Sequence, residues 1–125
     1  MRILIIDDSF HIVTQIKHFL TAAGYDDLVF ATSADEAFSQ LGVGTGVENA
    51  IGVDLILMDI WMPGVNGIEA TRRLKASAAF KDVPVIVATA DTSSESLQAA
   101  FGGFLLQLHQ TYLAYSLIIS HLGIV

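Results

Sequence analysis

The fold follows from the stretch Asp54-Leu-Ile-Leu-Met-Asp59-Ile-Trp-Met-Pro63-Gly-Val-Asn-Gly67, an apolar run that ends in one carboxylate and a turn. Residues 55–58 are uninterrupted hydrophobes, which is typical of a strand buried on both faces of a parallel sheet. Asp59 is therefore expected at the carboxyl end of a strand. Ligands of open α/β sheets bind at this edge, because the strand ends and the following loops form a crevice there.

Composition limits the classes of protein to consider. The chain has 125 residues, enough for one domain with its own core, and no cysteine, which excludes disulfides and thiolate metal sites. A formal net charge of −7 argues against direct nucleic-acid binding, which depends on clustered Lys and Arg. The apolar run between Met1 and Asp7 is too short for a secretory signal, so we expect a cytoplasmic protein.

Apolar runs alternate with helical patterns along residues 2–101. The runs predict strands over residues 2–6, 28–32, 55–58 and 84–88. Helical spacing predicts helices over residues 10–23, 34–41 and 68–76, and a fourth from Ser93 or Ser94 to Phe101. This alternation indicates the α/β class, with a doubly wound parallel sheet and right-handed crossovers.

Turn and cap residues support these boundaries. Gly24 follows the first helix as a stop, and Ser33-Ala-Asp-Glu36 is a capping-box pattern for the second. The turn before the third helix contains Pro63, Gly64, Asn66 and Gly67. Along that helix, over residues 68–76, we expect the apolar residues to face inward and the basic residues outward: Arg72, Arg73 and Lys75.

Acidic residues lie at the ends of two predicted strands. Asp7 and Asp8 end the first strand, Asp59 ends the third, and Thr89 ends the fourth. If the first and third strands are neighbours where the winding reverses, the three carboxylates converge. Such carboxylates repel one another, and a divalent cation relieves the repulsion. Oxygen ligands without His or Cys favour Mg²⁺ over zinc.

Three motifs in these regions resemble a known family. They are Ile5-Ile6-Asp7-Asp8-Ser9, Met58-Asp59-Ile-Trp-Met62-Pro63-Gly-Val-Asn-Gly67 and Val85-Ile-Val-Ala-Thr89-Ala90. In order and approximate spacing they are similar to the CheY-like receiver domain of two-component response regulators. The resemblance covers residues 1–101, which we take as the receiver core, and leaves residues 102–125 as an atypical C-terminal segment. It implies the flavodoxin-like strand order 2-1-3-4-5.

The resemblance also implies roles for individual residues. Asp59 is expected to be the phosphoacceptor, which takes its phosphoryl group from a partner sensor histidine kinase or phosphotransfer protein. The family pattern places Mg²⁺ on Asp8, on Asp59 and on the backbone carbonyl of Trp61, with Asp7 acting through water. The expected function is a conformational signalling switch, and not an enzyme that turns over a metabolite. Two further residues contact the phosphoryl group in this pattern: the hydroxyl of Thr89 bonds it and the small Ala90 leaves room for it.

Other interpretations of these residues were weighed. Asp8 with Ser9 is also a helix-cap pattern, but its combination with Asp59 and Thr89 favours the site. The Trp61 side chain either shields the acyl phosphate from water or packs on its loop, and both interpretations stay open. A flavodoxin-like cofactor binder is disfavoured, because the acidic turn at Asp7 and Asp8 repels a flavin phosphate.

The C-terminal segment departs from the family. Receiver domains carry a lysine at the end of the fifth strand, whereas here no Lys or Arg follows Lys81. The expected position falls near Thr111 when counted from Thr89 without gaps, or near Gln107 if residues 102–106 are the fifth strand. Without this charge we expect slower phosphotransfer. The alternative function is therefore a pseudo-receiver, a constitutive protein-binding or dimerisation module.

Residues 96–125 contain no charged side chain. One interpretation is a diverged fifth strand and helix, with residues 104–108 extended and residues 112–122 helical. Another is an interface that pairs two chains as a homodimer. A membrane helix is disfavoured, because Gln107, His109, Gln110, Thr111 and His121 interrupt the apolar run.

A changed reading frame also produces an abrupt loss of every charged residue where a family pattern stops. This hypothesis predicts that one of the other two frames of the gene encodes a Lys-Pro pair after a Phe-rich strand. Translating the gene in all frames tests it, and the absence of such a pair from both frames counts against it.

Overall fold

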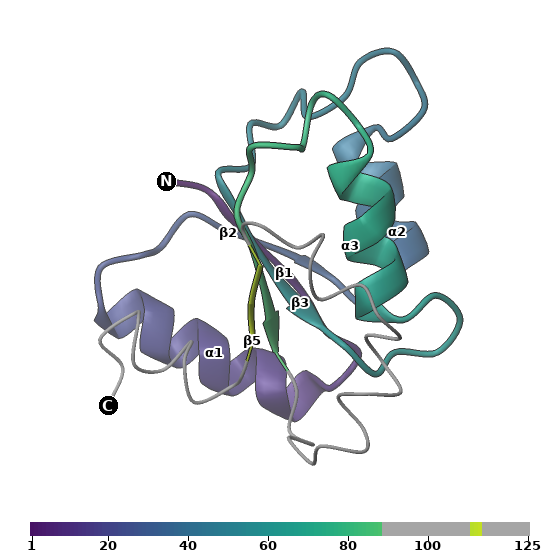
Figure 1. The fold of residues 1–125 in the computed structure, drawn as a ribbon. Helices are drawn as coiled ribbons and strands as arrows, with labels where there is room; N and C mark the ends of the chain where they lie inside the picture. Colours follow the sequence, from purple (N-terminus) through teal and green to yellow (C-terminus); the bar gives the residue numbers. More distant parts are fainter. Residues whose placement is uncertain (89–110, 114–125) are drawn as a thin grey trace.

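The structure, a computed structural model, describes residues 1–88 and 111–113. Its parallel sheet has the order β2-β1-β3-β4-β5. Helix α1 lies on one face of the sheet, and α2 and α3 lie on the other (Figure 1). The α/β class and the doubly wound parallel sheet are confirmed. The strands are β1 (Ile3–Ile6), β2 (Leu28–Ala31), β3 (Leu55–Asp59), β4 (Val85–Ala88) and β5 (Thr111–Leu113), and the helices are α1 (Phe10–Ala22), α2 (Ala34–Leu41) and α3 (Gly67–Lys75).

Side chains of the central strands alternate between two apolar layers. In β1, Ile3 and Ile5 pack in the layer that contains Ile16 and Leu20 of α1. Leu4 and Ile6 instead join the larger layer, which contains residues of α2 and α3. Both faces are therefore covered, which is why β1 and β3 have no polar residue at every second position. The same alternation holds in β3, with Leu55 and Leu57 in the first layer and Ile56 and Met58 in the second.

Each helix begins with a polar cap directly after a strand or turn. The hydroxyl of Ser9 accepts from the backbone N–H of Ile12 at 3.3 Å, and that of Ser33 accepts from Glu36 at 3.1 Å. The predicted capping box is completed differently, because the Glu36 carboxylate accepts from the backbone N–H and hydroxyl of Thr32, at 3.0 and 2.6 Å. This bond extends the cap back to the residue that follows β2.

The predicted bounds of the strands and helices within residues 1–88 differ from the observed ones by at most one residue at each end. Lys75 is less exposed than its predicted outward placement implies, since its side chain is half-buried. Its ammonium donates to the backbone carbonyls of Val83 and, at 3.3 Å, Lys81, so it bonds the end of α3 to the turn before β4. Burial lowers the pKa of this amine.

The predicted fourth helix, residues 93–101, and the predicted extended segment, residues 104–108, lie outside the described residues. Within the C-terminal segment the structure places a strand at Thr111–Leu113. The interpretation that begins a helix at Tyr112 is therefore wrong for this residue. Tyr112 pairs in parallel register with Ile86 of β4, and Thr and Tyr are both residues that favour strands.

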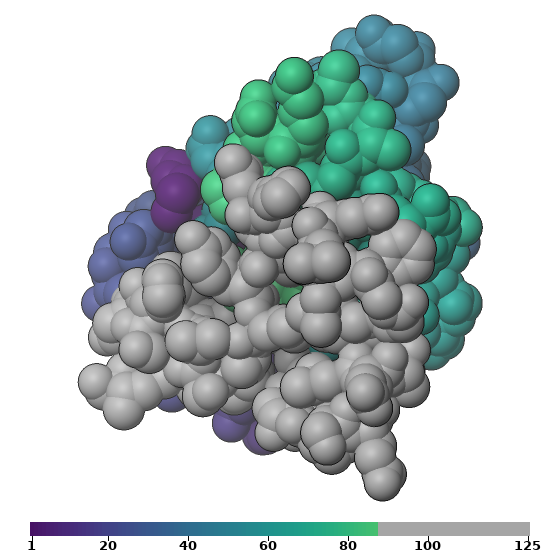
Figure 2. Space-filling view, viewed as in Figure 1, coloured from purple at the N-terminus to yellow at the C-terminus, as the bar shows by residue number. Residues whose placement is uncertain are grey.

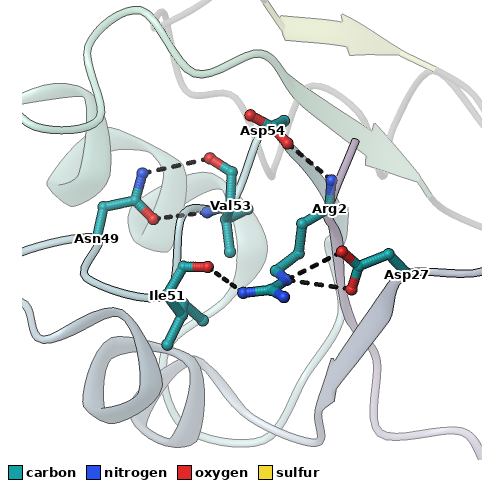
Figure 3. Close-up of polar contacts among 6 residues, drawn as sticks. All are labelled: Arg2, Asp27, Asn49, Ile51, Val53 and Asp54. Atoms are coloured by element: carbon teal, nitrogen blue, oxygen red, sulfur yellow. Dashed lines mark hydrogen bonds and ion pairs between the residues drawn. The ribbon is translucent and has the colours of Figure 1, made fainter.

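The amino-terminal edge of the sheet is tied together by Arg2 (Figure 3). Its backbone N–H donates to Asp54 at 2.7 Å, and its guanidinium donates to Asp27 at 3.1 Å and to the carbonyl of Ile51. These contacts join the start of β1 to the starts of β2 and β3. They also hold the last residues of the connection 42–54 at the sheet. The connection itself projects at the upper right of the molecule in Figure 2.

Among the described helices, none is both long and apolar enough to cross a bilayer.

Two phenylalanines allow a matched test of the core. Phe80 is completely buried in the layer between the sheet, α2 and α3, whereas Phe10 is 86% exposed. We expect Phe80→Ala to lower the free energy of unfolding by about 3–5 kcal/mol, because it removes a large buried side chain and leaves a cavity. Phe10→Ala should change it by less than about 0.5 kcal/mol. Urea titrations monitored by circular dichroism measure both, and equal losses for the two variants would contradict the described packing.

Candidate functional site

The pairing of β1 with β3 brings two acidic residues side by side. Ile6 is in register with Met58, and the next residues in the two strands' sequences are Asp7 and Asp59. Asp8 follows Asp7. Each of the three aspartates offers a carboxylate oxygen that lies within 4.8 Å of the other two. The structure thus brings together the three carboxylates that the sequence placed at strand ends, and we call them the acidic cluster: Asp7, Asp8 and Asp59.

The three residues differ in their exposure to solvent. Asp7 is only 7% exposed, Asp59 is half-buried and Asp8 is exposed. One oxygen of Asp7 accepts a hydrogen bond from the backbone N–H of Ser9 at 2.8 Å, which fixes this carboxylate at the start of α1. The cluster is therefore closed at Asp7 and open to solvent at Asp8.

The cap at the start of α1 bears on the helix-cap interpretation of Asp8 and Ser9. Ser9 is the N-cap residue, since its hydroxyl accepts from Ile12. Asp7 accepts from the amide of Ser9. Because Ser9 supplies the cap, Asp8 is not used for it and its carboxylate lies in the acidic cluster.

The electrostatics of the cluster favour a proton or a cation. Burial, followed by the charges of Asp7 and Asp8, raises the pKa of Asp59 from 3.8 to about 7, although the backbone amides of Trp61 and Ile60 oppose this shift. Burial also raises the pKa of Asp7, and the charge of Asp8 adds to this effect, against the amide of Ser9. Near neutral pH, three ionised carboxylates at this spacing require a counter-charge.

The donor set fits a small divalent cation that prefers oxygen. Two ligand atoms on opposite sides of a Mg²⁺ ion, each about 2.1 Å from it, are roughly 4.2 Å apart. The carboxylate oxygens of the cluster all lie within 4.8 Å of one another, which is a similar spacing. The cluster contains neither His nor Cys, which zinc prefers. The predicted division of roles, with direct ligation by Asp8 and Asp59 and a contact of Asp7 through water, stays a prediction.

The turn after Asp59 is anchored by its apolar residues. Ile60 is fully buried and Met62 is 7% exposed, whereas the Trp61 side chain between them is 43% exposed. The backbone N–H of Gly67 donates to the carbonyl of Ile60 at 2.8 Å and closes the turn. The Trp61 side chain is therefore not buried by the turn, and it lies two residues after Asp59 in the sequence.

The remaining predicted site residues, Thr89 and Ala90, lie outside the described residues, so their roles stay predictions. The last described residue of β4, Ala88, is in register with Asp59. In the sequence, Thr89 is the next residue after Ala88. β5 begins at Thr111, one of the two positions considered for the family lysine, and this residue carries no charge.

One residue of the site has a role that the sequence pattern does not indicate. Gly67 is a turn residue in the sequence, but in the structure it is the first residue of α3 and lies against the backbone of Asp59. The sequence gives one signal for this role. Gly67 directly follows the cap residue Asn66, at a helical position where glycine is conformationally unfavourable, so another reason for glycine is expected there.

The raised pKa of Asp59 predicts how stability depends on pH without divalent cations. The folded protein holds this proton more tightly than the unfolded chain, so its contribution to stability is present below pH 4 and is lost as pH rises through about 7. We expect Asp59→Asn, which is uncharged, to be more stable than wild type by about 1–2 kcal/mol at pH 8, and by much less at pH 5.

Urea unfolding in EDTA at both pH values measures this difference. Asp26→Asn is the matched control, because it removes one exposed carboxylate outside the acidic cluster. A gain for Asp59→Asn that is the same at pH 5 and pH 8 would contradict the electrostatic cause.

Comparison with known proteins agrees with this geometry. The response regulator receiver domain model matches residues 3–104. The chain is 36% identical over 97 residues to the CAI-1 autoinducer sensor kinase/phosphatase CqsS of Vibrio cholerae, which covers 77% of this chain but only 13% of that protein. It is 31% identical over 91 residues to a chemotaxis protein CheY homolog of Campylobacter jejuni, covering 73% of this chain and 65% of that protein.

Solved structures share the fold. The chemotaxis protein CheY4 of Vibrio cholerae has a TM-score of 0.70 at 22% identity, over 99% of this chain and 98% of that chain. The receiver domain of a sensor histidine kinase from Pseudomonas aeruginosa, solved with magnesium coordinated in its active-site cleft, has a TM-score of 0.72 at 24% identity, over 98% and 93% of the two chains. Together with the match over residues 3–104, these findings show that the chain belongs to the response regulator receiver domain family of two-component signalling.

Proposed function

We propose that this protein is a phosphoacceptor receiver domain, phosphorylated on Asp59 by a partner histidine kinase in an Mg²⁺-dependent reaction. The observation that carries the proposal is the acidic cluster, whose carboxylate oxygens lie within 4.8 Å of one another in a chain of this family. The phosphorylated chain acts as a conformational signalling switch and does not turn over a metabolite.

The transfer needs few protein groups. An oxygen of Asp59 attacks the phosphorus of a phosphohistidine, an O–P bond forms as the P–N bond breaks, and the histidine nitrogen leaves and takes up a proton. Catalysis of this step consists mostly of positioning and of charge stabilisation. Asp59 is suited to the attack because it is half-buried at a strand end, with the exposed Asp8 leaving one side of the site open to a partner.

Asp7 and Asp8 supply the charge that holds a cation beside the acceptor. With Mg²⁺ held by these residues, the ion would supply positive charge that stabilises the oxygens of the transferred group and the ionised form of Asp59, against the raised pKa of this carboxyl. The related receiver domain from Pseudomonas aeruginosa holds magnesium in its active-site cleft, which supports the same ion here.

The switch rests on Thr89 in this proposal. The phosphoryl group adds about −1.5 to −2 charges, and a hydrogen bond from a hydroxyl to it contributes about 1.5–3 kcal/mol. Because no lysine or arginine follows Lys81, part of this charge stays unneutralised and the phosphorylated conformation is less strongly favoured. We place the reaction in the cytoplasm, where ATP-dependent kinases obtain their phosphoryl groups.

Phosphorylation by a small donor tests the proposal directly. We expect the purified protein, incubated with acetyl phosphate and Mg²⁺, to gain the mass of one phosphoryl group, because the cation and the carboxylates position the donor. Asp59→Asn should gain none, and excess EDTA should abolish the gain for wild type. Intact-mass spectrometry measures each product.

Asp26→Asn is the control here as well and should be phosphorylated like wild type. If wild type binds Mg²⁺ but gains no phosphoryl group, the pseudo-receiver alternative, a constitutive binding or dimerisation module, replaces the proposal. Phosphorylation that persists in Asp59→Asn would place the acceptor on another residue.

A further inference from the structure

We infer that Gly67 is a positioning residue for Asp59: its missing side chain lets the start of α3 lie against the end of β3 and so sets where the carboxylate of Asp59 stands in the acidic cluster. This inference rests on the proposed function, since it concerns the same cation site. It assigns a role in cation binding to a residue that contacts the acceptor only through the backbone.

The contact between Gly67 and Asp59 leaves no space for a side chain. A Cβ atom on Gly67 would lie 2.0 Å from the carbonyl oxygen of Asp59, 2.8 Å from its carbonyl carbon and 2.9 Å from the Cα of Ile60. All three are backbone atoms, so no change of rotamer relieves the overlap. Gly67 is not among the residues with positive φ, and the requirement for glycine here is therefore steric and not conformational.

The start of α3 is rigid and is held against the sheet. Within the helix, the side-chain oxygen of Asn66 accepts from the backbone N–H of Glu69 at 2.9 Å, and the buried hydroxyl of Thr71 donates to the Gly67 carbonyl at 2.7 Å, so the first turn moves as one unit. Ile68 is 3% exposed in the apolar layer below. The N–H of Gly67 also bonds the Ile60 carbonyl at 2.8 Å. An added Cβ therefore displaces the peptide between Asp59 and Ile60.

A shift of this peptide changes the shape of the cation site. The pairing of Ile6 with Met58 holds β1 and β3 in register up to the residue before Asp59. Asp7 and Asp8 follow β1 and keep their place, so a shift of the peptide after Asp59 moves Asp59 relative to them. Mg²⁺ demands near-ideal octahedral geometry at about 2.0–2.1 Å, whereas Ca²⁺ accepts irregular geometry at about 2.3–2.6 Å. Displacement of one carboxylate therefore weakens Mg²⁺ binding more than Ca²⁺ binding.

The affinities of Gly67→Ala for the two ions test the inference. We expect the dissociation constant for Mg²⁺ to rise by about ten- to a hundredfold, the usual range for groups that orient metal ligands, and that for Ca²⁺ to rise much less. Titrations followed by the fluorescence of Trp61, the single tryptophan and two residues from Asp59, measure both constants.

Gly42→Ala is the matched control. A Cβ there would lie 2.6 Å from the carbonyl oxygen of Val47, at a residue with φ +69°, so this variant also strains the backbone. Gly42 caps the C-terminal end of α2, at the opposite edge of the sheet from the acidic cluster. We expect its loss of stability to leave both dissociation constants unchanged.

Each outcome is decisive. Equal changes for Mg²⁺ and Ca²⁺, or no change for either, overturn the inference, because a residue that only supports the fold does not distinguish the ions. The titrations are run in trimethylamine N-oxide with circular dichroism as a check of folding. A Gly67→Ala protein that stays unfolded there also overturns it, since the inferred shift is confined to the β3–α3 contact. Wild type that binds neither ion overturns the proposed function itself.

Discussion

The main constraint on this structure is that strands β1 and β3 must hold three negatively charged carboxylates close together. Asp7, Asp8 and Asp59 repel one another, and their placement on adjacent chain segments is unfavourable unless the pairing of β1 with β3 outweighs it. That pairing is strong because both strands are apolar on both faces, with Ile6 and Met58 fully buried directly before the acids. This repulsion adds to the effect of burial in raising the pKa of Asp59, and it is the reason that we propose a bound cation at this site.

The two edges of the sheet differ in how their charged side chains are arranged. At the amino-terminal edge, the Arg2 guanidinium pairs with Asp27 and donates to the Ile51 carbonyl, while the Arg2 backbone N–H donates to Asp54, and these contacts fix the strands. At the carboxyl-terminal edge the carboxylates face one another and no such pairing is built between Asp7, Asp8 and Asp59. The carboxyl-terminal edge is therefore the place where we propose a bound cation.

The contact between Gly67 and Asp59 links the fold to the site. Helix α3 packs on the sheet through Ile68 and Leu74, both buried, and this packing fixes the position of its first residue. Because that residue touches the backbone of Asp59, the packing of α3 and the geometry of the acidic cluster are not independent.

Within residues 1–88, sequence reasoning placed the strands, the helices and the three acids correctly, because their positions depend on local properties. The apolar runs, the polar caps and the turn residues each act within a few positions along the chain, and their periods are visible in the sequence. Lys75 shows where this reasoning ends. Its charge predicts an exposed side chain, but the turn before β4 presents the carbonyls of Lys81 and Val83 to it, and no local pattern reports that contact.

The sequence by itself therefore determined the α/β class, the element bounds within residues 1–88 and which carboxylates stand at strand ends, since burial and periodicity act locally. Only the tertiary structure decided that Ser9 and not Asp8 caps α1, that Tyr112 belongs to a strand, and that Gly67 lies against Asp59. These facts depend on distances between segments that are far apart in the chain or on a choice among equivalent local partners. Such distances are set by the packing of whole elements, which no short stretch of residues encodes.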